Sequence, residues 1–195
     1  MANISGAVVI KQDKVNDVIK AILGAVGSQV LVGIPAAAGE HDNAEISNAA
    51  LGYIHEFGSP SRNIPARAFL LPGVKDSTEE CAQELKWGMK EILAGRSMTS
   101  SLHRAGHIAL NAVRAQFYHN NWVELQPQTV AQRYKQRGTK SRRANEKAYL
   151  IMISQGAAPD IAQAIAGIRP LMNTLQLFKS ITYVVRDVGI KNAAV

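Results

Sequence analysis

Cysteine, aromatic residues and long apolar runs are scarce in this sequence, and each shortage excludes a class of protein. A single cysteine, Cys81, excludes a disulfide framework within the chain and predicts folding in a reducing compartment. No apolar run approaches the ~20 residues that a membrane helix needs. The first residues lack the basic leader and apolar block of a secretory signal. We therefore expect a protein that is soluble and cytoplasmic when it is made, with no membrane partner.

The residues that are present are enough for a folded core. Hydrophobic residues make up 47% of the 195 residues and charged residues 19%, a balance that disfavours wholesale disorder. Aromatic residues contribute only 6%, so alanine and aliphatic side chains must form most of the core, which suits closely packed helices. The length fits one domain, and we treat residues 1–195 as a single domain.

Positive charge is concentrated in one stretch of the chain. The formal net charge is +7, and residues 133–147 carry seven basic residues against Glu146 alone, which leaves +1 for the rest. Because this stretch has little apolar content, we predict an exposed basic arm or loop at about residues 133–147. Its principal cations are Arg133, Lys135, Arg137, Lys140, Arg142 and Arg143.

Two interpretations of the basic arm are open at this point. Blocks of like charge are often interaction tails, and this one suits either DNA phosphates or an acidic protein surface. The other interpretation is a solvated loop that aids solubility. If the arm binds DNA phosphates, the main alternative function is that of a small, non-specific DNA-binding protein.

Apolar periodicity predicts several helices. Apolar residues recur at helical spacing in four stretches, at residues 14–26, 43–57, 76–94 and 99–120. Shorter helices are expected at residues 127–134, at 146–166 with a break near 156–159, and at 174–180. The stretch at 43–57 places Tyr53 and Phe57 on its apolar stripe.

Two β-branched runs near the ends of the chain predict strands, at residues 29–35 and 181–185. We expect the two strands to pair, which gives an α+β fold with several helices packed on a small antiparallel sheet. Because two strands alone make a marginal sheet, we advance the hypothesis that neighbouring subunits complete it.

No group of residues has the spacing of a catalytic or metal site. His103 and His107 lie four apart on a predicted helix, but Arg104 between them and the lack of further ligands disfavour a metal ion. His55 lacks the second histidine, four residues later, of a metalloprotease motif. No nucleophile is paired with a base. We therefore predict that the protein is not an enzyme and has no cofactor.

Three stretches, in a fixed order, resemble a known family. They are VLVGIP at 30–35 with YIHEFG at 53–58, IPARAFL at 64–70, and WVEL at 122–125 with PLMNTLQLFKSI at 170–181. In this order they resemble the tail-completion or virion-morphogenesis (neck) proteins of Mu-like phages, which are related to the minor tail protein Z group. The sequence has Ala68 and Leu175 where the family usually has Pro and Gly. These departures leave the C-terminal packing and the position in the neck open.

The resemblance implies a structural virion protein at the head–tail junction, where it joins the tail tube to the head-side connector as part of a ring. The implied partners are further copies of the chain in a ring, which is a hexamer by analogy with the family, a tail tube or tail terminator protein, and a head-side connector or collar protein. Genomic DNA passing through the lumen is a further implied partner. The implied location is the neck or tail of the virion, after assembly in the host cytoplasm.

The apolar segment at 64–70 is the candidate subunit interface. Apolar residues on a loop beside prolines suit a groove on a neighbouring subunit, and an arginine there can pair with acidic groups across an interface. The predicted interface residues are Ile64, Arg67, Phe69 and Leu70. The alternative is that these hydrophobic residues fill the core of their own subunit.

Overall fold

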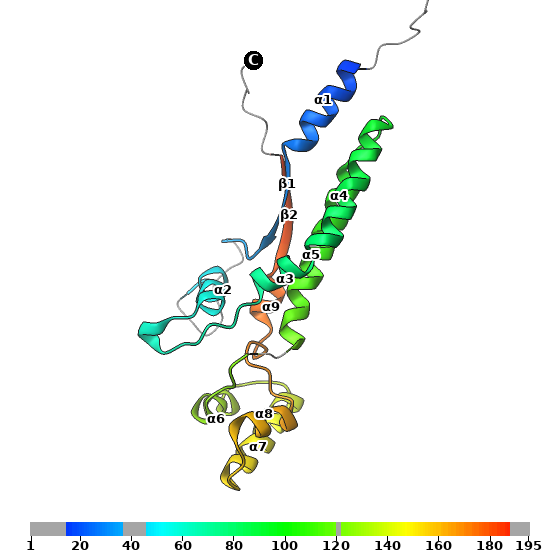
Figure 1. Cartoon of the computed structure of the whole chain (residues 1–195). Helices are drawn as coiled ribbons and strands as arrows, with labels where there is room; N and C mark the ends of the chain where they lie inside the picture. Colours follow the sequence, from blue (N-terminus) through cyan, green and yellow to red (C-terminus); the bar gives the residue numbers. More distant parts are fainter. Residues whose placement is uncertain (1–14, 37–45, 120–121, 188–195) are drawn as a thin grey trace, which may run out of the picture.

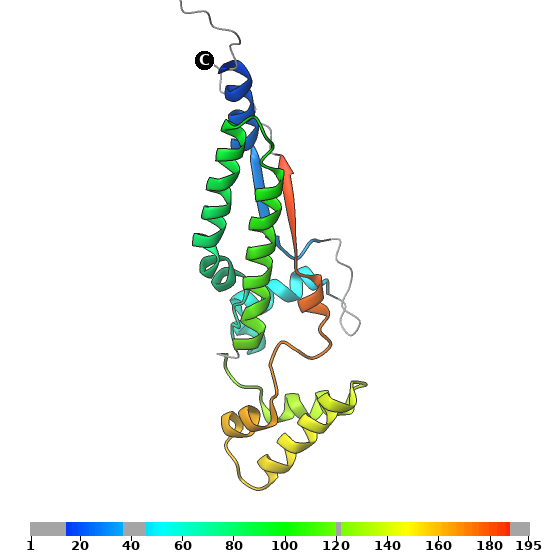
Figure 2. The same cartoon turned by 90° about the vertical axis from the view of Figure 1, so that its right-hand side faces the viewer.

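The computed structural model describes residues 15–36, 46–119 and 122–187, and the molecule is elongated. Its long helices and its two strands run along the length of the molecule, and three short helices cluster at one end (Figure 1 and Figure 2). Within the described ranges, nine α-helices and one 3-10 helix pack on a two-stranded antiparallel sheet, which confirms the α+β class. No helix in these ranges is long and apolar enough to cross a bilayer.

The two strands come from opposite ends of the chain. β1 (Ser28–Gly33) and β2 (Thr182–Asp187) pair antiparallel, with Val32 opposite Tyr183. This pairing confirms the expectation from the two β-branched runs. One face of the two-stranded ribbon packs against α5 (Thr99–His119), the longest helix.

A hairpin of two long helices supports the ribbon. α4 (Thr78–Leu93) packs along α5, close to the helices expected at 76–94 and 99–120. The short helix α3 (Leu70–Asp76) crosses α5 at Gly73, where the two backbones nearly touch. A Cβ atom at Gly73 would lie 2.4 Å from the Cα atom of Val113, so only glycine allows this crossing.

We use the name main body for α1 (Val15–Val26), α2 (Asn48–Phe57), α3, α4, α5, α9 (Gln176–Ser180) and the two strands. Its core centres on Phe117, which has no exposed surface and packs against the rings of Phe69, Trp122 and Phe178 at centroid distances of 4.9, 5.9 and 5.5 Å. The buried residues of this core are Phe69, Leu110, Val113, Phe117, Leu171, Leu177 and Ile181.

The three helices at the end of the molecule form what we call the distal lobe: α6 (Pro127–Lys135), α7 (Lys140–Ser154) and α8 (Pro159–Ala166). The lobe has its own core, in which the hydroxyl of the fully buried Tyr149 donates a hydrogen bond to the carbonyl of Leu125 (3.3 Å). The break between α7 and α8 confirms the expected interruption near residues 156–159. The chain thus has two separate cores, and its treatment as one domain over residues 1–195 stays a prediction.

Four short elements complete the described fold: α1 (Val15–Val26), α2 (Asn48–Phe57), a 3-10 turn (Pro60–Arg62) and α9 (Gln176–Ser180). α2 starts later than the expected residue 43, because Ser47 caps it by accepting a hydrogen bond from the N–H of Ala50 (3.1 Å). Residues 43–45 lie outside the described residues.

The structure differs from the predictions at two places. The sequence patterns predicted no helix over residues 70–75, where α3 forms. Pro72 is tolerated there because it lies in the first turn, where its missing N–H has no partner within the helix. The basic arm at 133–147 is mostly helical instead, since α6 continues to Lys135 and α7 begins at Lys140.

The close crossing of α3 and α5 predicts opposite effects for two glycine substitutions. Gly73→Ala should lower the free energy of unfolding by about 1–3 kcal/mol, because the new methyl group meets the backbone of Val113. The matched control is Gly24→Ala in α1, where a Cβ atom meets nothing within 4 Å, and it should raise stability by about 0.5–1 kcal/mol. Chemical denaturation measures both, and equal stability of the two variants would contradict the observed crossing.

Candidate interaction sites

The segment at 64–70 is bound tightly within its own chain. Phe69 is 1% exposed and lies in the core of the main body. The guanidinium of the buried Arg67 donates to the carbonyl of Val123 from Nε (3.2 Å) and from Nη2 (3.1 Å). Burial lowers the pKa of Arg67, and the carboxylate of Glu124 opposes that shift. The indole N–H of Trp122 donates to the carbonyl of Ala68 (3.0 Å).

These contacts correct the prediction for the subunit interface. Phe69 and Arg67 are not available to a neighbouring subunit. Phe69 is buried in the core, and the buried guanidinium of Arg67 is hydrogen-bonded to the carbonyls of Val123 and Glu124. The alternative, that the loop hydrophobes fold inward, describes Phe69 correctly. Ile64 and Leu70 are half-buried, and a role for them in an interface stays a prediction.

A buried carboxylate holds the same segment from the other side. Glu56 of α2 accepts hydrogen bonds from the N–H groups of Phe69 and Leu70 through Oε2 (2.9 Å each) and from Leu71 through Oε1 (2.8 Å). These N–H groups open α3 and have no partner within the helix, so Glu56 caps α3 from outside. In the sequence, Glu56 belongs to the YIHEFG stretch at 53–58, and a capping role for it was not predicted.

The hydrogen bonds that Glu56 accepts explain why α2 buries a different face from the one that apolar periodicity predicts. Its buried residues are Asn48, Gly52 and Glu56, at four-residue spacing, whereas Tyr53 and Phe57 are 66% and 57% exposed. The expected apolar stripe therefore faces outward. The spacing of Asn48, Gly52 and Glu56 was the available signal for the buried face, but apolar periodicity pointed to the other side.

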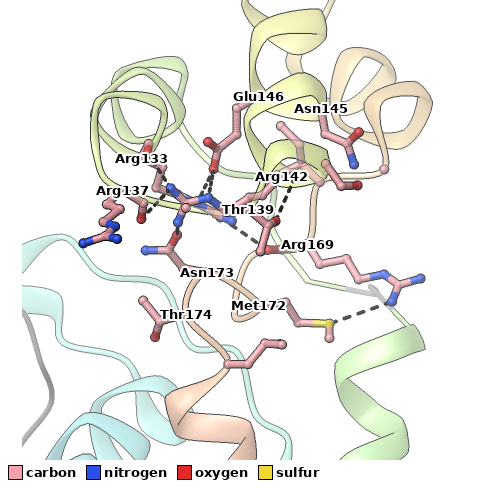
Figure 3. Close-up of a pocket in the computed structure, with 15 residues that line it drawn as sticks. Arg133, Arg137, Thr139, Arg142, Asn145, Glu146, Arg169, Met172, Asn173 and Thr174 are labelled. Atoms are coloured by element: carbon pink, nitrogen blue, oxygen red, sulfur yellow. Dashed lines mark hydrogen bonds and ion pairs between the residues drawn. The ribbon is translucent and has the colours of Figure 1, made fainter.

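A second buried carboxylate organises the distal lobe (Figure 3). The side chain of Glu146 is 1% exposed, and Arg133 and Arg142 both point at it, with Nε atoms 3.2 and 3.5 Å from Oε1. Burial lowers the pKa of Arg133, while the charge of Glu146 acts in the opposite direction. We call these three residues the arginine–glutamate cluster.

Arg142 also joins three parts of the chain. Its Nη2 donates to the carbonyls of Arg133 (3.0 Å), Gln136 (3.1 Å) and Arg137 (3.3 Å), at the C-terminal end of α6. Its Nη1 donates to the side-chain oxygen of Asn173, in the segment that leads back to the main body. The guanidinium of Arg142, in the first turn of α7, therefore caps the C-terminal end of α6 and anchors the segment that leads back to the main body.

The cluster gives the physical reason why the basic stretch is not an arm. Arg142, Glu146 and Tyr149 lie at spacings of four and three on α7, so a charged pair and one aromatic ring form the inward face that aliphatic residues usually supply. The hydroxyl of Thr139 caps α7 by accepting from the N–H of Arg142 (3.2 Å). The loop between α6 and α7 is limited to residues 136–139.

The remaining cations of the stretch face solvent. Lys135, Arg137, Lys140, Arg143 and Lys147 are all exposed. The guanidinium of Arg143 lies 5.3 Å from the ring centre of Tyr134, which limits its motion. The predicted cationic residues thus divide into a pair that is bonded within the lobe, the buried Arg133 and the half-buried Arg142, and an exposed set.

Beside the arginine–glutamate cluster lies a cavity of about 470 Å³. Its charged lining consists of four arginines against one carboxylate: Arg133, Arg137, Arg142, Arg169 and Glu146. Arg169 packs over the ring of Tyr118 at 4.9 Å. The lining holds positive charge but, among the described residues, places no nucleophile beside a base.

The histidines and the cysteine considered from sequence have structural contacts. The ring of Tyr183 lies against His107 (centroids 4.8 Å), and its hydroxyl is 3.1 Å from Nδ1 of His103. The thiol of the half-buried Cys81 donates to the carbonyl of Ala105 (3.4 Å). Across the described ranges, no three potential ligands gather in the arrangement of a metal site.

Large apolar side chains are exposed on the main body. No residue of α1 is buried, and Ile19, Leu23 and Val26 form a stripe along it with exposed fractions of 48%, 51% and 68%. We call these three residues the α1 stripe. On the sheet, Leu31 and Val184 face each other across the strands and are both exposed.

The α1 stripe continues into an apolar groove of about 740 Å³. β1 forms one wall of this groove, α4 forms the other, and residues of α5 also line it. The lining includes Val26, Val30, Leu85, Met89 and Leu102.

Comparisons of the chain with protein-family models, with curated proteins and with solved structures find no match.

The capping role of Glu56 predicts a local effect of Glu56→Gln. An amide nitrogen cannot accept a hydrogen bond, so at least one N–H group at the start of α3 loses its partner. We expect the free energy of unfolding to fall by about 1.5–3 kcal/mol, the range for a hydrogen bond to a charged group. Hydrogen exchange should accelerate at the amides of Leu70 and Leu71, and unchanged exchange there would contradict the cap.

The arginine–glutamate cluster predicts a larger loss for Glu146→Gln. This change leaves the guanidiniums of the buried Arg133 and the half-buried Arg142 without their counter-charge, and we expect it to cost about 3–5 kcal/mol in a denaturation experiment. The matched control is Glu84→Gln, which breaks the exposed ion pair with Arg104 (2.6 Å) and should cost at most about 1 kcal/mol. Similar losses in the two variants would show that Glu146 is not a structural centre of the lobe.

Proposed function

We propose that this chain is a structural subunit of a tailed-phage virion, which assembles with copies of itself into a ring at the head–tail junction. Its activity is binding, without catalysis. The observation that carries the proposal is the large amount of apolar surface that the main body leaves uncovered on α1, on α2 and on the outer face of the sheet.

Among these uncovered apolar surfaces, the α1 stripe gives the strongest support for self-association. α1 extends past the end of the sheet (Figure 1). Its apolar side chains Ile19, Leu23 and Val26 are exposed. An amphipathic helix gains most of its stability by burying its apolar face, and full burial of one such side chain contributes about 1.5–3 kcal/mol. A neighbouring copy that covers Ile19, Leu23 and Val26 supplies this burial.

The sheet also favours assembly. Among the residues that the structure describes, no further strand pairs with the two edges of the ribbon, and two strands alone are marginally stable. The edges belong to different strands, so pairing β1 of one copy with β2 of the next is a head-to-tail contact. Head-to-tail contacts close into rings when the rotation between copies permits it. The apolar groove that β1 lines offers further surface to the same neighbour.

The resemblance to phage neck proteins supplies the biological setting of the proposal. The stretches that carry it contact one another: Glu56 caps the segment at 69–71, Arg67 bonds to Val123, and Trp122 bonds to Ala68. Contacts among all three stretches support their interpretation as one structural motif. The partners above and below the ring remain those that the resemblance implies, a head-side connector or collar protein and a tail tube or terminator protein.

The proposal predicts that the α1 stripe is needed for self-association. The double variant Ile19→Gln and Leu23→Gln keeps helix propensity and should convert an oligomer into the 21.1 kDa monomer, as measured by size exclusion with light scattering. The matched control, Ile161→Gln with Ile165→Gln on α8, removes exposed apolar residues from the distal lobe and should leave the mass unchanged.

Two results would contradict the proposed function. One is a wild-type protein that stays monomeric at high concentration with a full native circular dichroism spectrum. The other is the absence of this polypeptide from purified virions of the phage that encodes it, as determined by mass spectrometry of the particles.

A further inference from the structure

We propose that the outward face of α7 is a binding site for the phosphate backbone of duplex DNA. The contacting residues are Lys140, Arg143 and Lys147, which we call the α7 basic face, joined by Lys135 and Arg137 at the end of α6. This inference goes beyond the proposed ring, and it holds for the subunit whether or not the ring forms.

The geometry of α7 separates the two kinds of cation. Lys140, Arg143 and Lys147 lie at spacings of three and four, so they share one side of the helix and are all exposed. Arg142 and Glu146 lie on the opposite, inward side. The three outward cations extend over about 10 Å of helix, which is long enough to face several phosphates of a duplex.

The charge of the distal lobe is not balanced locally. Residues 122–169 contain eight basic and three acidic residues, a net charge of +5 within a chain of +7. The acidic residues are Glu124, Glu146 and Asp160. Glu146 is held between Arg133 and Arg142, and the other two lie outside α7, so no carboxylate of this helix neutralises its outward face.

The composition of the face favours DNA over an acidic protein. Protein interfaces have apolar or aromatic centres and few lysines, whereas DNA interfaces are polar and strongly cationic. Beside the cations of the α7 basic face lie the small exposed residues Ala144 and Ala148, and Ile151, four residues after Lys147, is the one large exposed apolar residue of α7. The extensive exposed apolar surface of the molecule lies elsewhere, on the main body and on α8.

The structure also limits the set of residues in the basic stretch that are free to bind DNA. Arg133 and Arg142 are excluded, because their guanidiniums are occupied by Glu146, by backbone carbonyls and by Asn173. Contacts from the exposed cations to phosphates do not read the bases, so the expected affinity is independent of DNA sequence. The affinity decreases as the salt concentration rises.

The test is a titration of the full chain against a fluorescent duplex, followed by anisotropy at several salt concentrations. With five phosphate contacts, the wild-type affinity should fall about 500-fold between 50 and 200 mM NaCl. The triple variant Lys140→Gln, Arg143→Gln and Lys147→Gln retains two phosphate contacts. Its affinity for the duplex should fall only about 12-fold over the same range of salt concentration. These side chains are exposed, so the variant should keep the wild-type circular dichroism spectrum and melting temperature.

A control variant separates a local site from general charge. Lys20→Gln, Lys75→Gln and Lys86→Gln remove three cations of the main body that are likewise exposed, and this variant should keep the wild-type salt dependence. Equal weakening by the two triple variants overturns the site on α7, as does a wild-type protein with no salt-dependent affinity for the duplex. Poly-glutamate that competes as well as DNA at equal charge would assign the face to an acidic protein and overturn the DNA assignment.

Discussion

Glu146 lies in the interior of the distal lobe, where a carboxylate is costly unless cations or donors surround it. Arg133 and Arg142 surround it, and Arg142 then reaches the last carbonyls of α6 and the side chain of Asn173. This cluster fixes the end of one helix, the start of the next and the segment that returns to the main body. It also decides which cations remain available, because two arginines are used internally.

The main body uses a buried carboxylate in the same way. Glu56 satisfies three N–H groups at the start of α3, which then crosses α5 at Gly73. The polar and small residues of α2 must face inward for this contact, so Tyr53 and Phe57 are turned outward. Part of the apolar surface that we interpret as an assembly surface is therefore a consequence of one capping interaction.

The two halves of the molecule present different chemistry to their surroundings. The main body exposes apolar side chains and open strand edges, which suit contacts with other copies of the chain. The distal lobe exposes cations on α7 with little large apolar surface between them, which suits a polyanion. A ring subunit that contacts both protein neighbours and passing DNA would need this separation, because apolar and phosphate contacts require different surroundings.

The amino-acid sequence by itself determined the two strands and the long helices α4 and α5, because apolar spacing reflects local backbone geometry. It also indicated that the terminal strands pair. Only the tertiary structure decided that Glu56 and Arg142 lie inside and that Phe57 lies outside. Apolar periodicity assigns such charged residues to the surface. Their burial depends on donors and acceptors such as the N–H of Leu71 and Oδ1 of Asn173, which only the folded chain brings within reach.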